Sequence, residues 1–211
     1  MKPKVNYRRY KKSDYQACEA LVRKAWGFEQ HFTPRHVANS MAFFYTSGAP
    51  VACNFNLVAE VEGQVIGFIF GTNNKKLRQT IPFSYQLKSI LTLVKYWLHP
   101  AASWRQKQSI MAELSTHSRN RSKLRADWES ELSLFVIDSE YQGLGIGSYM
   151  ANAFIDDCKK YGVKEVTVEA NKAGASSYYE KLGFNYSGQF YSPLHERCSN
   201  CGDACLYIYP L

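Results

Sequence analysis

Apolar residues recur at strand or helix spacing through the first third of the chain, which predicts a strand, two helices and a hairpin in that order. Helix starts are indicated by Ser or Asp before an apolar period of about 3.6, and by Pro, which suits the first helical position. A two-residue turn, Glu62-Gly63, is typical of an antiparallel hairpin. The predicted elements are a strand over 5–10, a helix after Ser13-Asp14, a helix after Thr33-Pro34, and hairpin strands over 57–61 and 65–70.

The second half alternates strands and helices. An apolar strand over 132–137 turns through 138–141 into an amphipathic helix that begins near Gly145 and stops at Gly162. Because strands and helices are interleaved with a hairpin, the pattern predicts an α/β (α+β) fold, with a mixed, mostly antiparallel central sheet flanked by helices. The later elements are a strand around 166–168, a short helix over 174–182, and closing strands over 184–191 and 204–209.

A basic segment separates these two halves. Residues 75–128 hold eleven Lys or Arg against Glu113 and Asp127, giving +9, whereas the remainder has fifteen basic and sixteen acidic residues. Leu87, Ile90, Leu91, Val94 and Leu98 follow helical spacing, and 103–115 is consistent with a second helix before the polar run 116–123. We interpret 75–128 as a helical insertion, either a cover whose charges face water or a lid that shapes an acceptor pocket. Binding of nucleic acid or of an anionic membrane surface is the less favoured alternative.

Composition agrees with one globular unit. With 211 residues, 45% hydrophobic and 21% charged, the chain is long enough to bury a core, and we expect a single domain over 1–211. The basic N-terminus is not followed by an apolar run of signal-peptide length, and the longest apolar stretch, 90–98, is interrupted by Lys95. We therefore expect a soluble, cytoplasmic protein.

The loop Gln142-Gly143-Leu144-Gly145-Ile146-Gly147 is the most informative feature for function. Three alternate glycines leave backbone N–H groups uncovered where a helix begins, and those groups lie at the positive end of the helix dipole. Such an arrangement binds pyrophosphate.

Two well-known nucleotide-binding loops match this segment less well. A dinucleotide fold needs a third glycine where Ser148 stands, although Glu169 closes the next strand at about the expected distance. A nucleotide hydrolase needs a Lys followed by Ser or Thr, which is absent. The alternative to a binding loop is a glycine-rich turn that serves only close packing of the strand against the helix.

Two motifs resemble the GNAT acetyltransferase superfamily. Gln142-x-x-Gly145-x-Gly147 after an apolar strand resembles its acetyl-CoA signature, and Tyr179-Glu180-Lys181-Leu182-Gly183-Phe184 resembles its Y-x-K-x-G-F segment, with Ala175 four residues earlier. Together they cover about 131–186, and their joint spacing is more specific than either motif alone. The resemblance implies a GNAT fold with acetyl-CoA as co-substrate.

The resemblance also assigns residues to the cofactor. Phe135, Val136 and Ile137 are expected to pair with the pantetheine arm, and the Val136 N–H to point at the acetyl carbonyl. Asn171 is expected to bind pantetheine, although it lies one residue further from Ala175 than the family spacing. The residues expected around the pyrophosphate are Gln142, Gly143, Leu144, Gly145, Ile146, Gly147 and Ser148.

Two residues are the candidates for acid–base chemistry. The resemblance assigns Tyr179 as the acid that protonates the departing thiolate, and aligns Glu131 with a glutamate that some members use as general base. A packed helix tyrosine, with Tyr178 beside it, and an exposed strand-end carboxylate are the structural alternatives. Glu129 and Glu60 compete with Glu131 for the role of base.

The C-terminal cysteines raise the question of a metal. His195, Cys198, Cys201 and Cys205 place four soft ligands within eleven residues, in a predicted loop and at the start of the last strand, which makes them zinc candidates. A complete site normally takes its second pair of ligands from further away, so our default is reduced structural thiols and no resident metal. The histidines at 31, 36, 99 and 117 show no metal-binding spacing.

Taken together, the sequence predicts an acetyl-CoA-dependent N-acetyltransferase. The acceptor is expected to be an amine of a small molecule or a peptide, attacked directly in a ternary complex. Two further classes stay open: a non-catalytic acyl-CoA-binding module, and a polyanion-binding protein with a regulatory acetyl-CoA site. A dimer is compatible with the sequence, which does not determine the oligomeric state.

Overall fold

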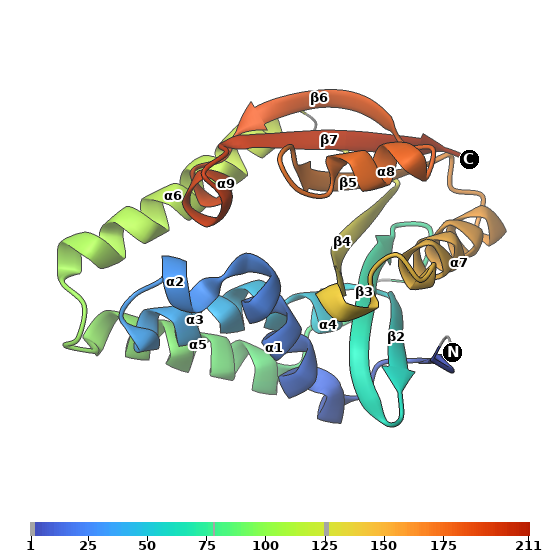
Figure 1. Ribbon diagram of the computed structural model, residues 1–211. Coiled ribbons are helices and arrows are strands. Elements are labelled where there is room, and N and C mark those ends of the chain that lie inside the picture. Colours follow the sequence, from blue (N-terminus) through green and yellow to red (C-terminus); the bar gives the residue numbers. More distant parts are fainter. Residues whose placement is uncertain (1–2, 78, 125–126) are drawn as a thin grey trace.

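The computed structural model of the chain describes residues 3–77, 79–124 and 127–211. These residues form a sheet of seven strands in the order β1-β2-β3-β4-β5-β7-β6, flanked by helices (Figure 1). Neighbouring strands are antiparallel except for β4 and β5, which are parallel, so the predicted mixed and mostly antiparallel sheet is confirmed. The strands are β1 (Asn6–Arg8), β2 (Phe55–Val61), β3 (Gln64–Asn73), β4 (Ser130–Ile137), β5 (Glu165–Asn171), β6 (Asn185–Tyr191) and β7 (Asp203–Pro210).

The N-terminal elements follow the local signals closely. Glu62 and Gly63 both adopt positive φ, 50° and 82°, as a tight turn between twisted antiparallel strands requires. Pro34 was expected at the first helical position but is the N-cap residue of the second long helix, which begins one residue later at Arg35. Two single-turn helices were not predicted, because four residues are too few to show an apolar period. The helices here are α1 (Tyr15–Trp26), α2 (Phe28–His31), α3 (Arg35–Ser47) and α4 (Ala49–Ala52).

Alternation along the central strands builds a core on each face of the sheet. Leu134 and Val136 of β4 pack with α1 and α3, whereas Phe135 and Ile137 point to the opposite face. That opposite face is covered by α7 (Ile146–Lys160) and α8 (Ser176–Lys181). Gly145 caps α7 with a φ of 82°, and Gly162, with a φ of 66°, follows its end, as the sequence predicts.

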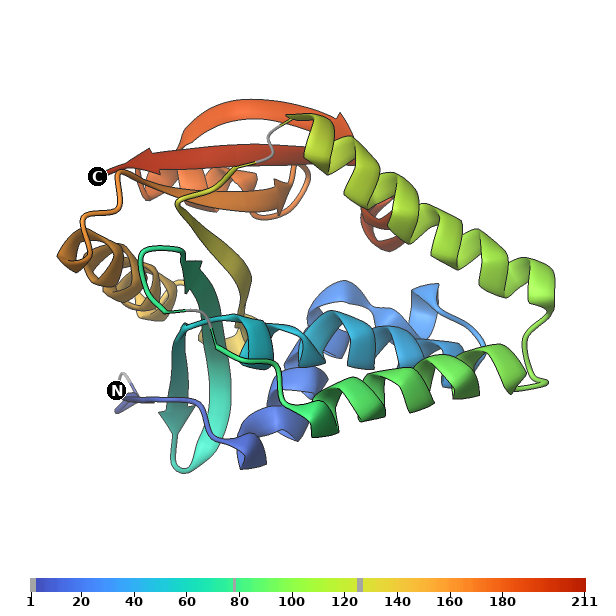
Figure 2. The ribbon, with the colours of Figure 1, turned by 180° about the vertical axis from the view of Figure 1, so that it is seen from behind.

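The insertion between β3 and β4 forms two long helices, α5 (Phe83–Leu98) and α6 (Trp104–Leu124). Figure 2 shows α6 running from the far end of α5 to the ends of β6 and β7. The expectation that the second helix stops before the polar run 116–123 is wrong, because this run continues α6. Its polar side chains are satisfied by neighbouring elements: Asn120, for example, donates to the carbonyl of Tyr191 at 2.8 Å. Arg78 and Arg125, which contribute to the predicted charge, lie outside the described residues.

The expectation of a loop before the last strand is also wrong, since α9 (Pro193–Ser199) occupies it. Ser192 caps this helix, its hydroxyl accepting from the His195 N–H at 3.1 Å, and Pro193 occupies the first helical position. His195 and Cys198 therefore lie on a helix. Among the residues described, no helix is both long and apolar enough to cross a bilayer.

One cation of the insertion does not face water. Lys107 of α6 is only 3% exposed, and its ammonium donates to the carbonyls of Trp97 (2.8 Å) and His99 (2.6 Å) at the end of α5. In return the hydroxyl of Tyr96 donates to the Lys107 carbonyl at 3.0 Å. A positive charge at a helix C-terminus satisfies carbonyls that have no intrahelical partner. Lys107 thereby fixes the turn between α5 and α6.

We expect Lys107→Met to destabilise the protein by roughly 1–3 kcal/mol, because it leaves buried carbonyls without a donor. Arg105→Met, at an exposed position of the same helix, is the matched control and is expected to change the free energy of unfolding by less than about 0.5 kcal/mol. Urea denaturation followed by circular dichroism measures both. Equal effects of the two substitutions would show that Lys107 does not hold the turn.

Candidate active site

The strands β4 and β5 separate shortly after they meet. They pair only through Glu131 with Thr167 and Leu132 with Val168. Beyond these pairs β4 remains hydrogen-bonded to β3, and in the described residues 134–137 have no partner on the β5 side. Unpaired backbone N–H and C=O groups are obligatory hydrogen-bonding groups, so this edge can accept an extended ligand in place of a strand. The predicted pantetheine contacts, Phe135, Val136 and Ile137, lie on this edge.

A bulge in β4 accompanies the separation. Phe70 pairs with Leu134 and Gly71 with Leu132, which leaves Ser133 without an opposite residue. A bulged residue bends its strand and increases the local twist. It also reverses the alternation, so Leu132 packs with α7 whereas Leu134 packs with α1 and α3. Ser133 thus marks the point where β4 turns away from β5.

The glycine loop lies at the open end of β4, where the sequence predicts it. Gly143 and Gly145 have φ values of 76° and 82°, and a Cβ at either position would meet no atom within 4 Å. Their need for glycine is therefore conformational, and the space beside them is free. Gln142 donates from its side chain to the Ile137 carbonyl at 3.3 Å, which ties the loop to the strand. Because the residues from Gln142 to Gly145 are exposed, the start of α7 is accessible to an anion.

The two tyrosines of α8 differ in environment. Tyr179 is 5% exposed and packs against the rings of Phe184 and Tyr207; burial, and then Tyr178 and Tyr45, raise its pKa, so the phenol stays protonated at neutral pH. Burial also raises the pKa of Tyr178, to about 12. The Tyr178 hydroxyl lies 2.9 Å from the place a Cβ on Gly147 would take, so Tyr178 borders the glycine loop.

Asn171 ends β5 and already has protein partners. Its amide donates to the Ser199 hydroxyl (2.7 Å) and to the Cys201 carbonyl (3.3 Å), and its side-chain oxygen accepts from the Ala173 N–H (2.8 Å). These bonds hold the β5–α8 loop against the end of α9. In this geometry the Asn171 side chain stabilises the loop. To contact pantetheine it would have to give up one of these three hydrogen bonds.

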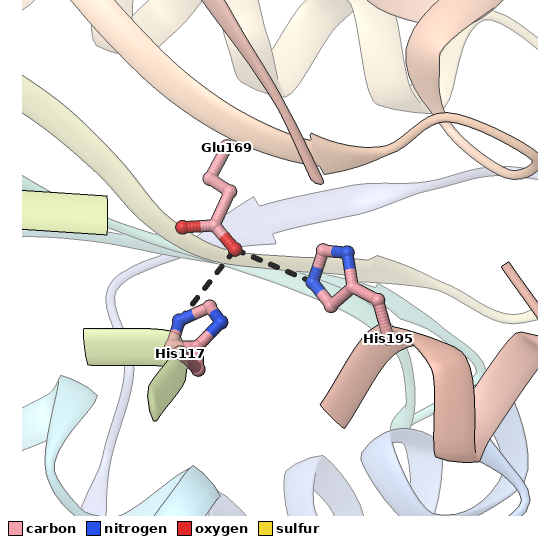
Figure 3. Close-up of side chains that lie close together, drawn as sticks. All are labelled: His117, Glu169 and His195. Atoms are coloured by element: carbon pink, nitrogen blue, oxygen red, sulfur yellow. Dashed lines mark ion pairs between the residues drawn. The ribbon is translucent and has the colours of Figure 1, made fainter. Parts of the chain in front are cut away.

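An ionic cluster lies where β4 and β5 part. Arg121 of α6 binds Glu131 of β4 and, through Nε at 2.8 Å, Glu169 of β5, so one guanidinium links the two strands. His117 of α6 and His195 of α9 both point at Glu169, with Nε2 atoms 3.7 and 3.3 Å from Oε1 (Figure 3). All five side chains are mostly buried, with 16–26% of their surface exposed. The site therefore draws on four separate elements.

Burial and charge move the carboxylates of this cluster in opposite directions. Burial raises the pKa of Glu131 above its usual range, and the Glu169 charge adds to this, although Arg121 opposes both. Burial also acts to raise the pKa of Glu169, but the hydrogen bond from His195 and the charges of His117, His195 and Arg121 outweigh it, so the pKa is lowered. Burial lowers the pKa of His117, with Glu169 opposing, which favours its neutral imidazole.

Electrostatic coupling connects this cluster to α8. Burial of its hydroxyl end, and then the charge of Glu169, raise the pKa of Tyr45 on α3, and Tyr45 in turn contributes to the raised pKa of Tyr179. Charged groups influence one another in this way only across short distances.

The competing carboxylates are used elsewhere. Glu60 accepts from Arg8 Nε at 2.7 Å, and Glu129 accepts from the backbone N–H of Lys164 at 2.7 Å. These partners lower the pKa of both groups. Neither Glu60 nor Glu129 shares the environment that raises the pKa of Glu131.

The structure does not bring the predicted zinc candidates together. Cys205 is buried in β7 on one face of the sheet, whereas Cys198 packs against the core on the other. The described group that does place three ligand atoms within 4.8 Å of one another is His117, Glu169 and His195. Two imidazoles and a carboxylate suit a divalent metal, but the guanidinium of Arg121 on the same carboxylate disfavours a cation there.

The sequence reasoning missed most of this cluster. His117 and His195 are 78 residues apart, and no spacing rule connects them. Glu169 carried a signal: Val166 and Val168 face the α7 core, so alternation places Thr167, Glu169 and Asn171 on the other face together. The sequence did not indicate that α6 and α9 would cover that face.

Comparisons with known proteins agree with this architecture. A family model described as an acetyltransferase (GNAT) domain matches residues 108–192. N-alpha-acetyltransferase 30 of Schizosaccharomyces pombe is 34% identical over 82 residues, which cover 37% of this chain and 52% of that protein. The chain therefore matches about half the length of this relative.

Solved structures share the fold over nearly the whole chain. SsHAT superposes with a TM-score of 0.66 at 18% identity, covering 99% of this chain and 98% of that one. Ard1 from Thermoplasma volcanium superposes with a TM-score of 0.53 at 15% identity, covering 98% of this chain and 97% of that one. At such identities the likeness concerns the fold. Over residues 108–192, which include β4, α7, β5 and α8, the chain is thus similar to GNAT acetyltransferase domains, and both motifs lie at the strand separation.

Proposed function

We propose that the protein transfers an acetyl group from acetyl-CoA to an amine by direct attack in a ternary complex. The observation that carries the proposal is the separation of β4 from β5, which leaves a free strand edge leading to an exposed glycine loop at a helix N-terminus. A free strand edge fits the amide-rich pantetheine arm, and the loop fits the diphosphate.

The cofactor contacts in this proposal are mostly backbone groups. Phe135 and Ile137 would pair with the pantetheine arm, the Val136 N–H would polarise the acetyl carbonyl, and residues from Gln142 to Ser148 would surround the diphosphate. Asn171 would add a contact at the end of β5. Main-chain donors held by a sheet need no reorganisation as the carbonyl oxygen gains charge, which is why they stabilise a tetrahedral intermediate effectively.

The chemical step moves two protons. The amine nitrogen attacks the acetyl carbon and a C–N bond forms. The C–S bond then breaks to release the thiolate of coenzyme A, and the nitrogen loses an N–H proton, which restores Tyr179. Tyr179, protonated because its pKa is raised, would donate its proton to the thiolate. The attacking amine must first lose a proton to a base on the far side of the carbonyl.

Glu131 is our candidate for that base. Its raised pKa brings the carboxylate closer to the pH at which it works, and it lies at the last pairs before the strands part. A pair formed by His117 and Glu169 is the structural rival, since a neutral imidazole beside a carboxylate is a competent proton acceptor. Glu131 and Glu169 are both bound by Arg121, so kinetic measurements are needed to decide which group is the base.

The acceptor is an amine that is cationic in solution. Similarity to an N-alpha-acetyltransferase favours an α-amine of a peptide as the acceptor. A small-molecule amine is the alternative substrate. The alternative class, a module that only binds acyl-CoA, would not require the ionic cluster. If no amine tested causes release of free thiol, that alternative is favoured.

Gly145→Val is expected to weaken acetyl-CoA binding by at least roughly 100-fold, about 2.7 kcal/mol, because a β-branched residue is strained at positive φ and fills the space beside the loop. Gly162→Val, at the opposite end of α7, imposes the same backbone strain and is the matched control. Isothermal titration with acetyl-CoA measures both, on proteins whose folding is checked by circular dichroism. Equal affinities for the two variants would reject the loop as the diphosphate site.

Tyr179→Phe is expected to lower kcat by roughly 10²–10⁴-fold with little change in acetyl-CoA affinity, because the ring packing is kept and only the proton is lost. Tyr178→Phe removes a hydroxyl one residue away and is expected to affect kcat much less. Steady-state release of free thiol with a peptide amine gives both values. A larger loss for Tyr178→Phe would reverse the assignment of the acid.

The base is identified by the pH profile. A base acts when deprotonated, so the rate should rise as pH increases through its pKa, which for Glu131 lies above its ordinary value and for His117 below. If Glu131 is the base, Glu131→Gln abolishes this acid limb, whereas His117→Asn leaves it in place. The reverse pattern in kcat/KM would assign the base to His117 and Glu169.

A further inference from the structure

The helix α5 presents its apolar side to solvent. Tyr85, Ser89, Thr92 and Tyr96, at helical spacing, are its more buried residues, and Tyr85 stacks on Phe43 of α3. The stripe at 87, 91, 94 and 98 lies on the opposite side, and Leu98 is 77% exposed. A surface helix in a globular protein ordinarily buries its apolar stripe. In α5 the apolar stripe is instead the exposed side of the helix.

The exposed stripe belongs to a larger apolar surface, which we call the α5 face. Nine of the seventeen large apolar side chains exposed in the described residues lie between 81 and 104, and α5 runs along the outer edge of the molecule (Figures 1 and 2). Contiguous apolar patches of this kind mark interaction sites. The residues of the α5 face are Ile81, Phe83, Leu87, Ile90, Leu91, Leu93, Val94, Leu98 and Trp104.

The charge around the α5 face has one sign. The sequence from Gly63 to Ala112 contains no Asp or Glu, and seven Lys or Arg fall within its last 38 residues. Lys88, Lys95 and Arg105 are exposed around the α5 face, and Lys88 also lies over the rings of Tyr15 and Phe43. Apolar side chains inside a basic margin are what an anionic interface recognises.

We propose that the α5 face docks onto the surface of an anionic lipid bilayer, with α5 lying in the interface plane. Leucine, isoleucine and phenylalanine side chains enter the boundary between headgroups and acyl chains, Trp104 lies at headgroup level, and the lysines meet lipid phosphates. The combination supplies both signals that stable peripheral binding needs, apolar burial and electrostatic attraction.

The same charge argues against a second copy of the chain as the occupant. A symmetric contact places the same surface on both sides, so two basic margins would face each other with no acidic residue of this segment to compensate them. A bilayer with anionic headgroups has the complementary sign. Charge therefore favours lipid over self-association.

Flotation of the full chain with vesicles tests the proposal. We expect binding to vesicles of phosphatidylcholine with phosphatidylglycerol, little binding to phosphatidylcholine alone, and weaker binding as salt increases. Leu91→Glu/Val94→Glu is expected to lower partitioning by more than about tenfold, because it places two anions in the apolar stripe. Both positions are 46–49% exposed, so the fold should tolerate them.

Tyr186→Glu is the control, since Tyr186 is 54% exposed on β6, away from α5, and gives the same kind of change. It should bind vesicles like the parent protein. The proposal is overturned if anionic vesicles are not bound, or if the double variant binds as the control does. It is also overturned if sedimentation shows a dimer that the double variant dissociates, because a second copy would then cover the α5 face.

Discussion

The brevity of the contact between β4 and β5 is the constraint on which the rest of the structure depends. Two parallel residue pairs hold the strands, and beyond them the bulge at Ser133 turns β4 away. A continuous ladder would satisfy the backbone groups of 134–137 within the protein and leave no edge for a ligand. The separation also leaves two half-sheets that need additional ties, and Arg121 provides one by binding Glu131 and Glu169 on the two strands.

The insertion acts at this separation through α6. His117 and Arg121 bring their charges into the site, and Glu113 pairs with Arg197 of α9 at 2.7 Å, so α6 and α9 close one side together. Lys107 anchors the opposite end of α6 to α5. Several of the cations that made this segment look like a solvated cover therefore point inward, while the apolar side chains of α5 point outward. The two helices differ because α6 faces carboxylates and carbonyls, whereas α5 packs on α3 through only a narrow stripe.

The ionisable groups that we propose for catalysis lie in opposed environments. Tyr179 is buried among aromatic rings and stays protonated, whereas Glu131 lies beside both a cation and another carboxylate. Opposed environments of this kind are how one site holds an acid and a base at the same pH.

The sequence alone determined the features that depend on neighbouring residues. Turn chemistry at Glu62-Gly63 and the glycines at the start of α7 lie as expected, because φ preferences act over a few residues. Asp14 precedes α1 as expected, but its carboxylate binds Arg8 and the Lys11 N–H instead of capping that helix. The position of Tyr179 and of the predicted cofactor strand followed from motif spacing. Tertiary structure decided what meets at the site: His117, Arg121, Glu131, Glu169 and His195 come from four elements and converge only when α6 and α9 cover the sheet. It also decided which side of α5 is buried, since periodicity defines a helix face but not the surface on which that face will pack.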